Sequence, residues 1–336
     1  MIERVVASVS DLFFNPEKRV FIGYLASAWV IGILWLCFSA RRSVGAALRH
    51  TFDKNTWLGR SARADYALLV INRVVMSFIT PALIGQLAIA TFWFHFLHNH
   101  FSPGAGHDVP RVVILSAFTI TLFMFDDASR YWVHRWMHRS PWLWPFHRVH
   151  HSAETLTPLT IFRTHPVEGV IYVLRSAVVQ GCSIGIFVFV FGDKVDLISI
   201  LGINVVIFAF NALGANLRHS NVPLHYPAWL EKWLISPAQH HIHHSVERRH
   251  HDRNFGVVLA IWDRMGNTLH PSEPDLHLRF GAKLDQSSSE HTLLRLYFQP
   301  FVSVFSRVPR TLRSLRQWVF NTARGGRPVS PTSKQR

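Results

Sequence analysis

Three closely spaced groups of histidines are the part of this sequence with the clearest chemistry. The chain has 336 residues and 22 histidines, and the groups are His134 and His138, then His147, His150 and His151, then His240, His243 and His244. On a helix, residues three or four positions apart lie on one face, so each group can present two imidazoles to one metal ion. Eight neutral nitrogen ligands are more than one ion needs. We therefore predict two metal ions that share these histidines.

Residues beside the groups indicate how they are presented. Ser140-Pro141 precedes the second group and Ser236-Pro237 precedes the third. Serine is a favoured N-cap and proline a favoured first helical residue, so both groups are predicted to lie in the first turns of short helices. A zinc protease of the HExxH type is disfavoured, because Arg135 stands where its general-base glutamate would be.

Apolar segments must bring these groups together. Hydrophobic residues make up 49% of the chain and charged residues only 16%, against about 25% charged in soluble domains. About 20 apolar residues cross a bilayer. The predicted spans are 20–40, 74–94, 111–125 within a longer helix, 169–191 and 197–213, of which the last two form a hairpin. We predict an all-α fold, an integral membrane helical bundle.

The distribution of positive charge gives the orientation of this bundle. Six Lys and Arg residues lie in the loop 41–64 and three lie before the first span, and short loops rich in these residues stay in the cytoplasm. Alternation then places 128–168, and the chain from about 217, on the cytoplasmic face. The histidines would form a helical cap there. A metal transporter would instead hold its ligands at mid-membrane depth.

Net charge and cysteine content argue against further classes of protein and of site. The formal net charge is +15, yet the sequence contains no nucleic-acid recognition motif, so we assign the charge to the membrane surface and expect no nucleic-acid partner. The two cysteines, Cys37 and Cys182, both lie in apolar segments. They provide neither a disulfide framework nor a cysteine metal site.

Longer motifs surround the histidines. They are Asp127-x-x-x-Tyr131-Trp132-x-His134-Arg135-x-x-His138, His147-x-x-His150-His151-Ser152, Arg163-x-His165-Pro166-x-Glu168, His219-Ser220-Asn221, Pro237-x-x-His240-x-x-His243-His244-Ser245, Asp252-x-Asn254-Phe255-Gly256 and Trp262-Asp263-Arg264. With these motifs, over roughly residues 111–270, the chain resembles the sterol desaturase and fatty acid hydroxylase superfamily of integral membrane di-iron oxygenases. Its closing segment departs from that family's Trp-Asp-x-x-Phe-Gly-Thr, because Met265-Gly266-Asn267-Thr268 follows here.

The resemblance implies a ligand set and a cofactor. The eight grouped histidines would be metal ligands, His219 a ninth ligand and His165 a weaker candidate. The cofactor would be two iron ions, for which zinc can substitute, with O2 as co-substrate. We expect His241 to be an extra basic surface residue, and the predicted topology places His98 and His100 on the opposite face of the membrane.

Polar residues near the histidines are candidates for further roles. Asp127, Tyr131 and His134 share one helical face by their spacing, and Asp252 and Asn254 belong to a family motif. We therefore predict catalytic roles for Asp127, Tyr131, Asp252 and Asn254. A metal-bound imidazole usually donates its other N–H to an acceptor, and the carboxylate candidates are Asp127, Glu154, Glu168, Asp252 and Asp263. The arginines that can hold an anionic lipid head group are Arg135, Arg163 and Arg218.

The implied function is hydroxylation of a lipid C–H bond at the cytoplasmic face, with electrons from an external donor of the ferredoxin or cytochrome b5 type. Desaturation on the same scaffold is an alternative, and a non-catalytic membrane protein that binds metal is another. The predicted domains are N-terminal membrane spans and loops in 1–110, a fatty acid hydroxylase-like catalytic domain in 111–275 with a membrane hairpin in 169–213, and a basic, partly interfacial tail in 276–336.

Overall fold

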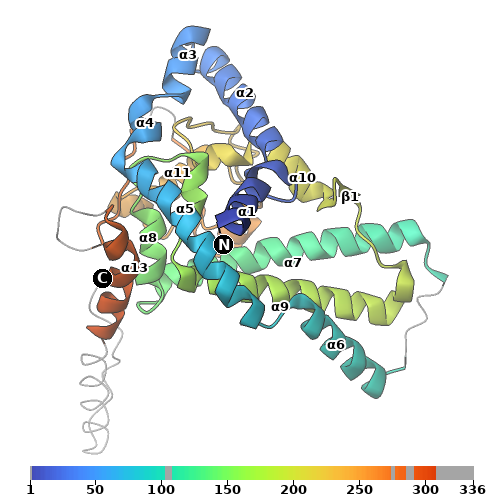
Figure 1. Ribbon diagram of the computed structural model, residues 1–336. Coiled ribbons are helices and arrows are strands. Elements are labelled where there is room, and N and C mark those ends of the chain that lie inside the picture. The colour runs from blue at the N-terminus through green and yellow to red at the C-terminus, as the bar shows by residue number, and fades with distance from the viewer. Residues whose placement is uncertain (1, 103–107, 274–276, 285–290, 308–336) are drawn as a thin grey trace, which may run out of the picture.

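Helices make up nearly all the regular structure of the protein. The computed structural model describes residues 2–102, 108–273, 277–284 and 291–307, and within them the only sheet is one antiparallel pair, β1 (Ser199–Ile200) and β2 (Ile203–Asn204). A helical arm extends from a more compact body (Figure 1). The all-α prediction is confirmed for this part of the chain.

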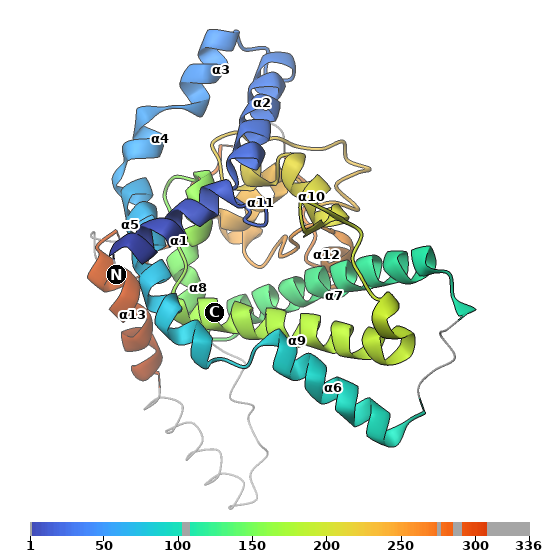
Figure 2. The same cartoon turned by 45° about the vertical axis from the view of Figure 1, so that its right-hand side comes forward.

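Three stretches of the described chain are long and apolar enough to cross a membrane, namely Arg60–His100, Arg111–Arg139 and Pro166–Lys194. They contain α5 (Arg60–Ile79), α6 (Gln86–His100), α7 (Arg111–Arg139) and α9 (Pro166–Phe191). Figures 1 and 2 show α6, α7 and α9 side by side in the arm. Large apolar side chains such as Phe92, Ile120 and Val178 are exposed there, as expected for contact with lipid.

Small residues on α9 allow its close contact with α6. A Cβ atom at Gly181 would lie 2.7 Å from the carbonyl oxygen of Gln86, and one at Gly185 would lie 2.8 Å from that of Ala90. Glycines four residues apart are a common device for packing membrane helices, because the backbones can approach each other.

The second predicted span, 74–94, is interrupted. α5 ends at Ile79, the 3-10 turn η1 covers Thr80–Ala82, and α6 starts only at Gln86. Pro81 lacks the N–H that a continuing helix needs and its ring clashes with the preceding turn. The predicted span 74–94 is therefore not one continuous helix, because the structure has a break at Pro81.

The segment 197–213, predicted as the second arm of a membrane hairpin, has a different structure. It contains β1, β2 and then α10 (Val205–Ala212), which has 8 residues. Eight residues give about 12 Å of helix, far less than the roughly 30 Å of a bilayer core. The side chain of Asn204 caps α10 and donates to the carbonyl oxygen of Thr119 on α7.

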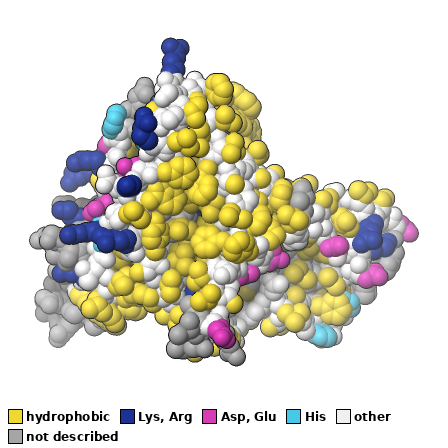
Figure 3. Space-filling model, turned by 45° about the horizontal axis from the view of Figure 1, so that its top comes forward, with side chains coloured by type: hydrophobic (Ala, Val, Ile, Leu, Met, Phe, Trp, Pro, Cys, Tyr) yellow, Lys and Arg dark blue, Asp and Glu magenta, His cyan; other side chains and the backbone are white. Residues whose placement is uncertain are grey.

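The N-terminal region covers the body with four helices, α1 (Ile2–Phe14), α2 (Ile22–Phe38), α3 (Val44–Thr51) and α4 (Lys54–Leu58). α2 lies within the first predicted span, but it has only 17 residues. Its buried side chains pack against Leu217, Val222 and Leu224. On the face seen in Figure 3, hydrophobic side chains cover a broad area, and Lys and Arg gather along one side.

Short helices complete the body. They are α8 (Trp144–His151), η3 (Pro158–Phe162), η5 (Ala215–Arg218), α11 (Pro237–His244), η6 (Arg248–His250), α12 (Ile261–Met265) and α13 (Leu293–Phe305), whereas η4 (Gly192–Lys194) follows α9 at the end of the arm (Figure 1). α13 has exposed apolar side chains, including Phe298 and Phe305, and buries Leu296. The rest of the predicted interfacial tail, from 308 onward, lies outside the described residues.

Candidate metal centre

Nine histidines that the sequence motifs contain lie together in two clusters. The first cluster is His134, His138, His147, His151 and His243, and the second is His150, His219, His240 and His244. Within each cluster, one ring nitrogen from each residue lies within 4.8 Å of the others. The rings come from α7, α8, α11 and the end of η5, so elements far apart in the sequence meet here.

Local sequence explains how α11 presents its histidines. The hydroxyl of Ser236 accepts from the N–H of Gln239, and the Gln239 side chain accepts from the N–H of Ser236, which forms a capping box. Pro237 is the first helical residue, as predicted. For the second group, the predicted helix start at Ser140-Pro141 is wrong. Ser140 ends α7, and α8 starts only at Trp144.

Hydrogen bonds fix the tautomers of two rings in the first cluster. Nδ1 of His134 lies 2.8 Å from the carbonyl oxygen of Phe255, and Nδ1 of His243 lies 2.8 Å from that of Arg253. A carbonyl only accepts, so each Nδ1 carries the proton and each Nε2 has a free lone pair. Nδ1 of His147 lies 3.0 Å from Oε1 of Glu168, which fixes a third ring in the same sense when the carboxylate is ionised.

The free nitrogens lie as close together as ligands of one ion. In the first cluster, Nε2 of His134 is 3.1 Å from Nε2 of His147, and Nε2 of His138 is 3.1 Å from that of His151. An imidazole nitrogen binds zinc at about 2.1 Å, so two such ligands are about 3.0 Å apart at a right angle and about 3.4 Å apart at a tetrahedral angle. Lone pairs this close repel each other unless a cation or a proton lies between them.

The second cluster has the same spacing. Nε2 of His219 lies 3.2 Å from Nε2 of His150, 3.1 Å from that of His240 and 3.2 Å from that of His244. Each of the two clusters can thus surround one metal ion. The chain's own donors fit a pair of ions bound by imidazole nitrogen.

Burial keeps the rings in the form that binds metal. It lowers the pKa of His147 to about 3 and, with the charge of His147 contributing, that of His150 to about 4. Burial also lowers the pKa of His219 and of His244 well below the usual value. These imidazoles are therefore neutral at pH 7, and a metal ion does not have to displace protons from them.

Asp127 and Asp263 hold the segment that orients His134. Oδ1 of Asp127 accepts from the N–H of Val258 at 3.0 Å, and Oδ2 accepts from the N–H of Leu259 at 3.0 Å and from Nε1 of Trp262 at 2.9 Å. Asp263 accepts from the N–H groups of Phe255 and Gly256. Both carboxylates therefore fix the loop that carries the Phe255 carbonyl.

Three further predicted site residues lie in the same region. The Tyr131 hydroxyl lies 3.1 Å from Oγ1 of Thr268 and accepts from Arg135 at 2.9 Å. Asn254 has a positive φ of 53°. Its side chain donates to the carbonyl oxygen of Gln239, near the start of α11. Asp252 has a φ of 58° and borders a hollow of about 570 Å³.

Comparison with known proteins gives a family for the part of the chain that contains these clusters. Residues 119–268 match the fatty acid hydroxylase family. The chain is 32% identical over 157 residues to an alkylglycerol monooxygenase of Danio rerio, covering 46% of this chain and 31% of that protein. It is 26% identical over 159 residues to a lathosterol oxidase of Mus musculus, covering 47% of each. It is 24% identical over 260 residues to a Delta(7)-sterol 5(6)-desaturase of Gibberella zeae, covering 76% of this chain and 64% of that protein.

These matches confirm the resemblance to the sterol desaturase and fatty acid hydroxylase superfamily. The matched region includes all nine clustered histidines. The chain spans less than half the length of the first two of these relatives. No solved structure matches the chain.

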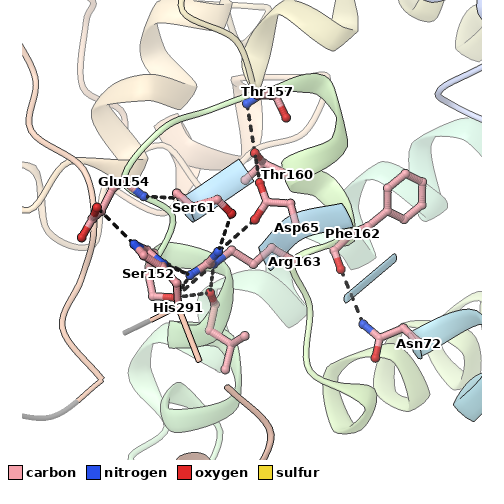
Figure 4. A network of polar contacts seen from close by, with 11 residues as sticks. Ser61, Asp65, Asn72, Ser152, Glu154, Thr157, Thr160, Phe162, Arg163 and His291 are labelled. Carbon is pink, nitrogen blue, oxygen red and sulfur yellow. Dashed lines mark hydrogen bonds and ion pairs between the residues drawn. The ribbon is translucent and has the colours of Figure 1, made fainter. Parts of the chain in front are cut away.

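A buried ion pair supports the second histidine group. Nη1 of Arg163 lies 2.9 Å from Oδ1 of Asp65, and Nε donates to the carbonyl oxygen of Val149 in α8 (Figure 4). Arg163 also donates to the hydroxyl of Ser152, directly after the group. Sequence reasoning missed Asp65, although a carboxylate inside the apolar segment 60–79 was the available signal.

Two arginines predicted to hold lipid head groups are buried. Arg163 is fully buried in the network of Figure 4, and Arg218 is buried with hydrogen bonds to the carbonyl oxygens of Ala215 and Val257. Both guanidinium groups therefore stabilise the fold. Only Arg135 of the three remains partly exposed.

Four other histidines have partners outside the clusters. His241 is buried and its Nε2 lies 3.2 Å from the carbonyl oxygen of Leu217, so it is not the surface residue that we expected. Nδ1 of His165 caps α9 and its Nε2 lies 3.0 Å from the carbonyl oxygen of Tyr297. His98 and His100 are exposed on α6.

Proposed function

We propose that the protein is a membrane-bound di-iron oxygenase that hydroxylates a lipid C–H bond with O2 and external electrons. The observation that carries this proposal is the convergence of nine histidines in two clusters, in which the Nε2 atoms of paired rings lie 3.1–3.2 Å apart. The similarity to an alkylglycerol monooxygenase and to a Delta(7)-sterol 5(6)-desaturase supports it.

The clustered histidines would hold the two iron ions. His134, His138, His147, His151 and His243 would bind one, and His150, His219, His240 and His244 the other. When bound, the iron pair would supply the reductive activation of O2 that yields an oxidant capable of attacking an unactivated C–H bond. Nitrogen ligation alone does not choose iron over zinc, so the choice rests on the family.

The chain itself positions the ligands and excludes water. Phe255 is fully buried. Its ring packs against His134, His138 and His243 with centroids 5.0–5.7 Å apart. Its carbonyl oxygen accepts from His134, so this one residue both shields and orients the first cluster. A lipid substrate would enter laterally beside α7 and α9, whose outer faces are apolar.

Electrons would come from a carrier protein of the ferredoxin or cytochrome b5 type. The hollow of about 570 Å³ supports this part of the proposal, because Arg139, Arg248 and Arg253 line it. The carbonyl oxygen of Arg253 accepts from His243, so one hydrogen bond separates the hollow from the first cluster. Basic side chains there would attract an acidic carrier. The distribution of positive charge favours the cytoplasmic face for this site.

Desaturation is the second candidate reaction, because removal of two hydrogens from the lipid starts with the same abstraction. The match to a sterol desaturase over 76% of this chain favours it as the alternative. A protein that binds metal without catalysis is the third candidate, and it would consume no O2.

The source of the oxygen atom in the product tests the proposal. Purified protein with iron, a reductant and a lipid mixture is supplied with 18O2, and the products are analysed by mass spectrometry. A hydroxylated lipid should carry the label, and a desaturated lipid should appear two mass units lighter with O2 consumed. Product that forms without O2, or that takes its oxygen only from water, would contradict the oxygenase proposal.

A further inference from the structure

A third cluster of metal-binding side chains lies outside the two histidine clusters. One nitrogen or oxygen atom from each of His250, His270 and Glu273 lies within 4.8 Å of the others. His250 is on η6 and is fully buried, whereas His270 and Glu273 follow α12 and are partly exposed. Two imidazoles and a carboxylate are a donor set that binds zinc and related divalent ions.

Hydrogen bonds leave lone pairs in this cluster without donors. Nδ1 of His270 lies 2.8 Å from the carbonyl oxygen of Pro271, so in the neutral ring, the form that binds metal, Nδ1 carries the proton and Nε2 is an acceptor. This Nε2 lies 3.9 Å from Oε1 of Glu273, which is also an acceptor. Two acceptors that face each other favour a cation between them.

His250 adds a buried nitrogen to the same place. Its Nδ1 lies 2.9 Å from the hydroxyl oxygen of Ser245, and its buried Nε2 has no partner among the residues that the structure describes. Metal-bound histidines commonly pair their other nitrogen with an acceptor, as Ser245 can do here. A buried polar nitrogen without a partner is costly, so a ligand at this position would satisfy it.

The nearby charges leave room for a cation. Arg249 pairs with Oε2 of Glu273 at 3.3 Å and with Glu247 at 3.1 Å. Two carboxylates thus balance the charge of the guanidinium. On Glu273 the guanidinium binds Oε2, whereas Oε1 is the oxygen nearest His270. Oε1 remains for a metal ion.

We propose that His250, His270 and Glu273 bind a divalent metal ion of the zinc class, with solvent as the fourth ligand. Three protein ligands and one water are a common coordination for zinc. The ion would connect the segment 270–273, through His250, to Ser245, the residue that ends α11. It would therefore brace the helix that carries the third histidine group, without taking part in the chemistry.

Metal stoichiometry tests this site. The full chain in detergent is equilibrated with excess Zn2+, passed through a desalting column and analysed for zinc per chain. His270→Ala and Glu273→Gln should each bind one ion fewer than the wild type, and Zn2+ should raise the thermal midpoint less in these variants. The comparison does not depend on how many ions the two histidine clusters hold.

Two controls make the result specific. His277→Ala removes an exposed histidine of the same segment and should leave the stoichiometry unchanged. His243→Ala should lose metal from the first histidine cluster yet keep the additional Zn2+, so failure of the proposed function and failure of this site are distinguishable. Equal zinc content in wild type, His270→Ala and Glu273→Gln would overturn the proposal. Circular dichroism would identify a variant that fails to fold, and Glu273→Gln, which keeps the side-chain shape, would then decide.

Discussion

Replacement of Asp127 by asparagine would test how the metal clusters are held in place. The carboxylate accepts three hydrogen bonds, one at Oδ1 from Val258 and two at Oδ2 from Leu259 and Trp262. The side-chain amide of the Asp127→Asn variant would be a poor substitute, because its NH2 group only donates. If the amide oxygen takes the position with two donors, the NH2 group faces the N–H of Val258.

The magnitude follows from these three bonds. Leaving the buried N–H of Val258 without an acceptor costs about 1–3 kcal/mol. The other two bonds lose their charge assistance, which is worth roughly 1 kcal/mol each. The Asp127→Asn protein should therefore be less stable by about 3–5 kcal/mol. The loosened segment contains Phe255, whose carbonyl orients His134, so the metal content of the first cluster should fall as well.

Thermal unfolding and metal analysis of the detergent-solubilised protein would measure both effects. Asp126→Asn is the matched control, because Asp126 is adjacent but pairs with Arg130 and Arg175 and does not hold the segment 255–263. This control separates the loss of a carboxylate charge at this place on α7 from the loss of the hydrogen bonds to the segment 255–263. A variant on a distant surface would not separate them. We expect Asp126→Asn to keep its metal. Full metal content and an unchanged thermal midpoint in Asp127→Asn would refute the reasoning.

Four shorter predictions follow from other parts of the structure. Burial lowers the pKa of His150 from 6.5 to about 4. The unfolded chain therefore takes up a proton before the folded protein does, so stability is full above about pH 6.5 and is lost as the pH falls towards 4. Metal content and thermal midpoint should decline through that window, and constant values down to pH 4 would contradict this. His243→Ala should lose metal and His100→Ala should not, as metal analysis would show. Gly185→Leu should separate α6 from α9, because a Cβ atom there would lie 2.8 Å from a backbone oxygen of α6; a thermal midpoint equal to the wild type would argue against this contact. Arg139→Glu should raise the KM for an acidic electron carrier, and steady-state kinetics at low salt would detect it.

The sequence by itself determined the elements whose signals are local. The spacing of the histidines, the Ser236-Pro237 start of α11 and the apolar character of α7 and α9 are all readable within a few turns of helix. The motifs also sufficed to recognise the resemblance to the superfamily, which the family match confirms. Such features depend on neighbours in the chain, so their physical causes are present in the sequence itself.

The tertiary structure decided how the histidines are divided. His147 and His151 join the first cluster while His150 joins the second, and His243 is likewise separated from His240 and His244. Adjacent positions on a helix point about 100° apart, and their partners depend on how α7, α8, α11 and η5 pack.

Other features depended on contacts between distant parts of the chain. Asp127 meets a segment 131 residues later, and Asp65 meets Arg163 across 98 residues. The short α10 likewise depends on packing that hydropathy does not describe. Sequence patterns report which face of an element is apolar or polar, whereas its partner is chosen only when the whole chain folds and each buried charge must find a counterpart.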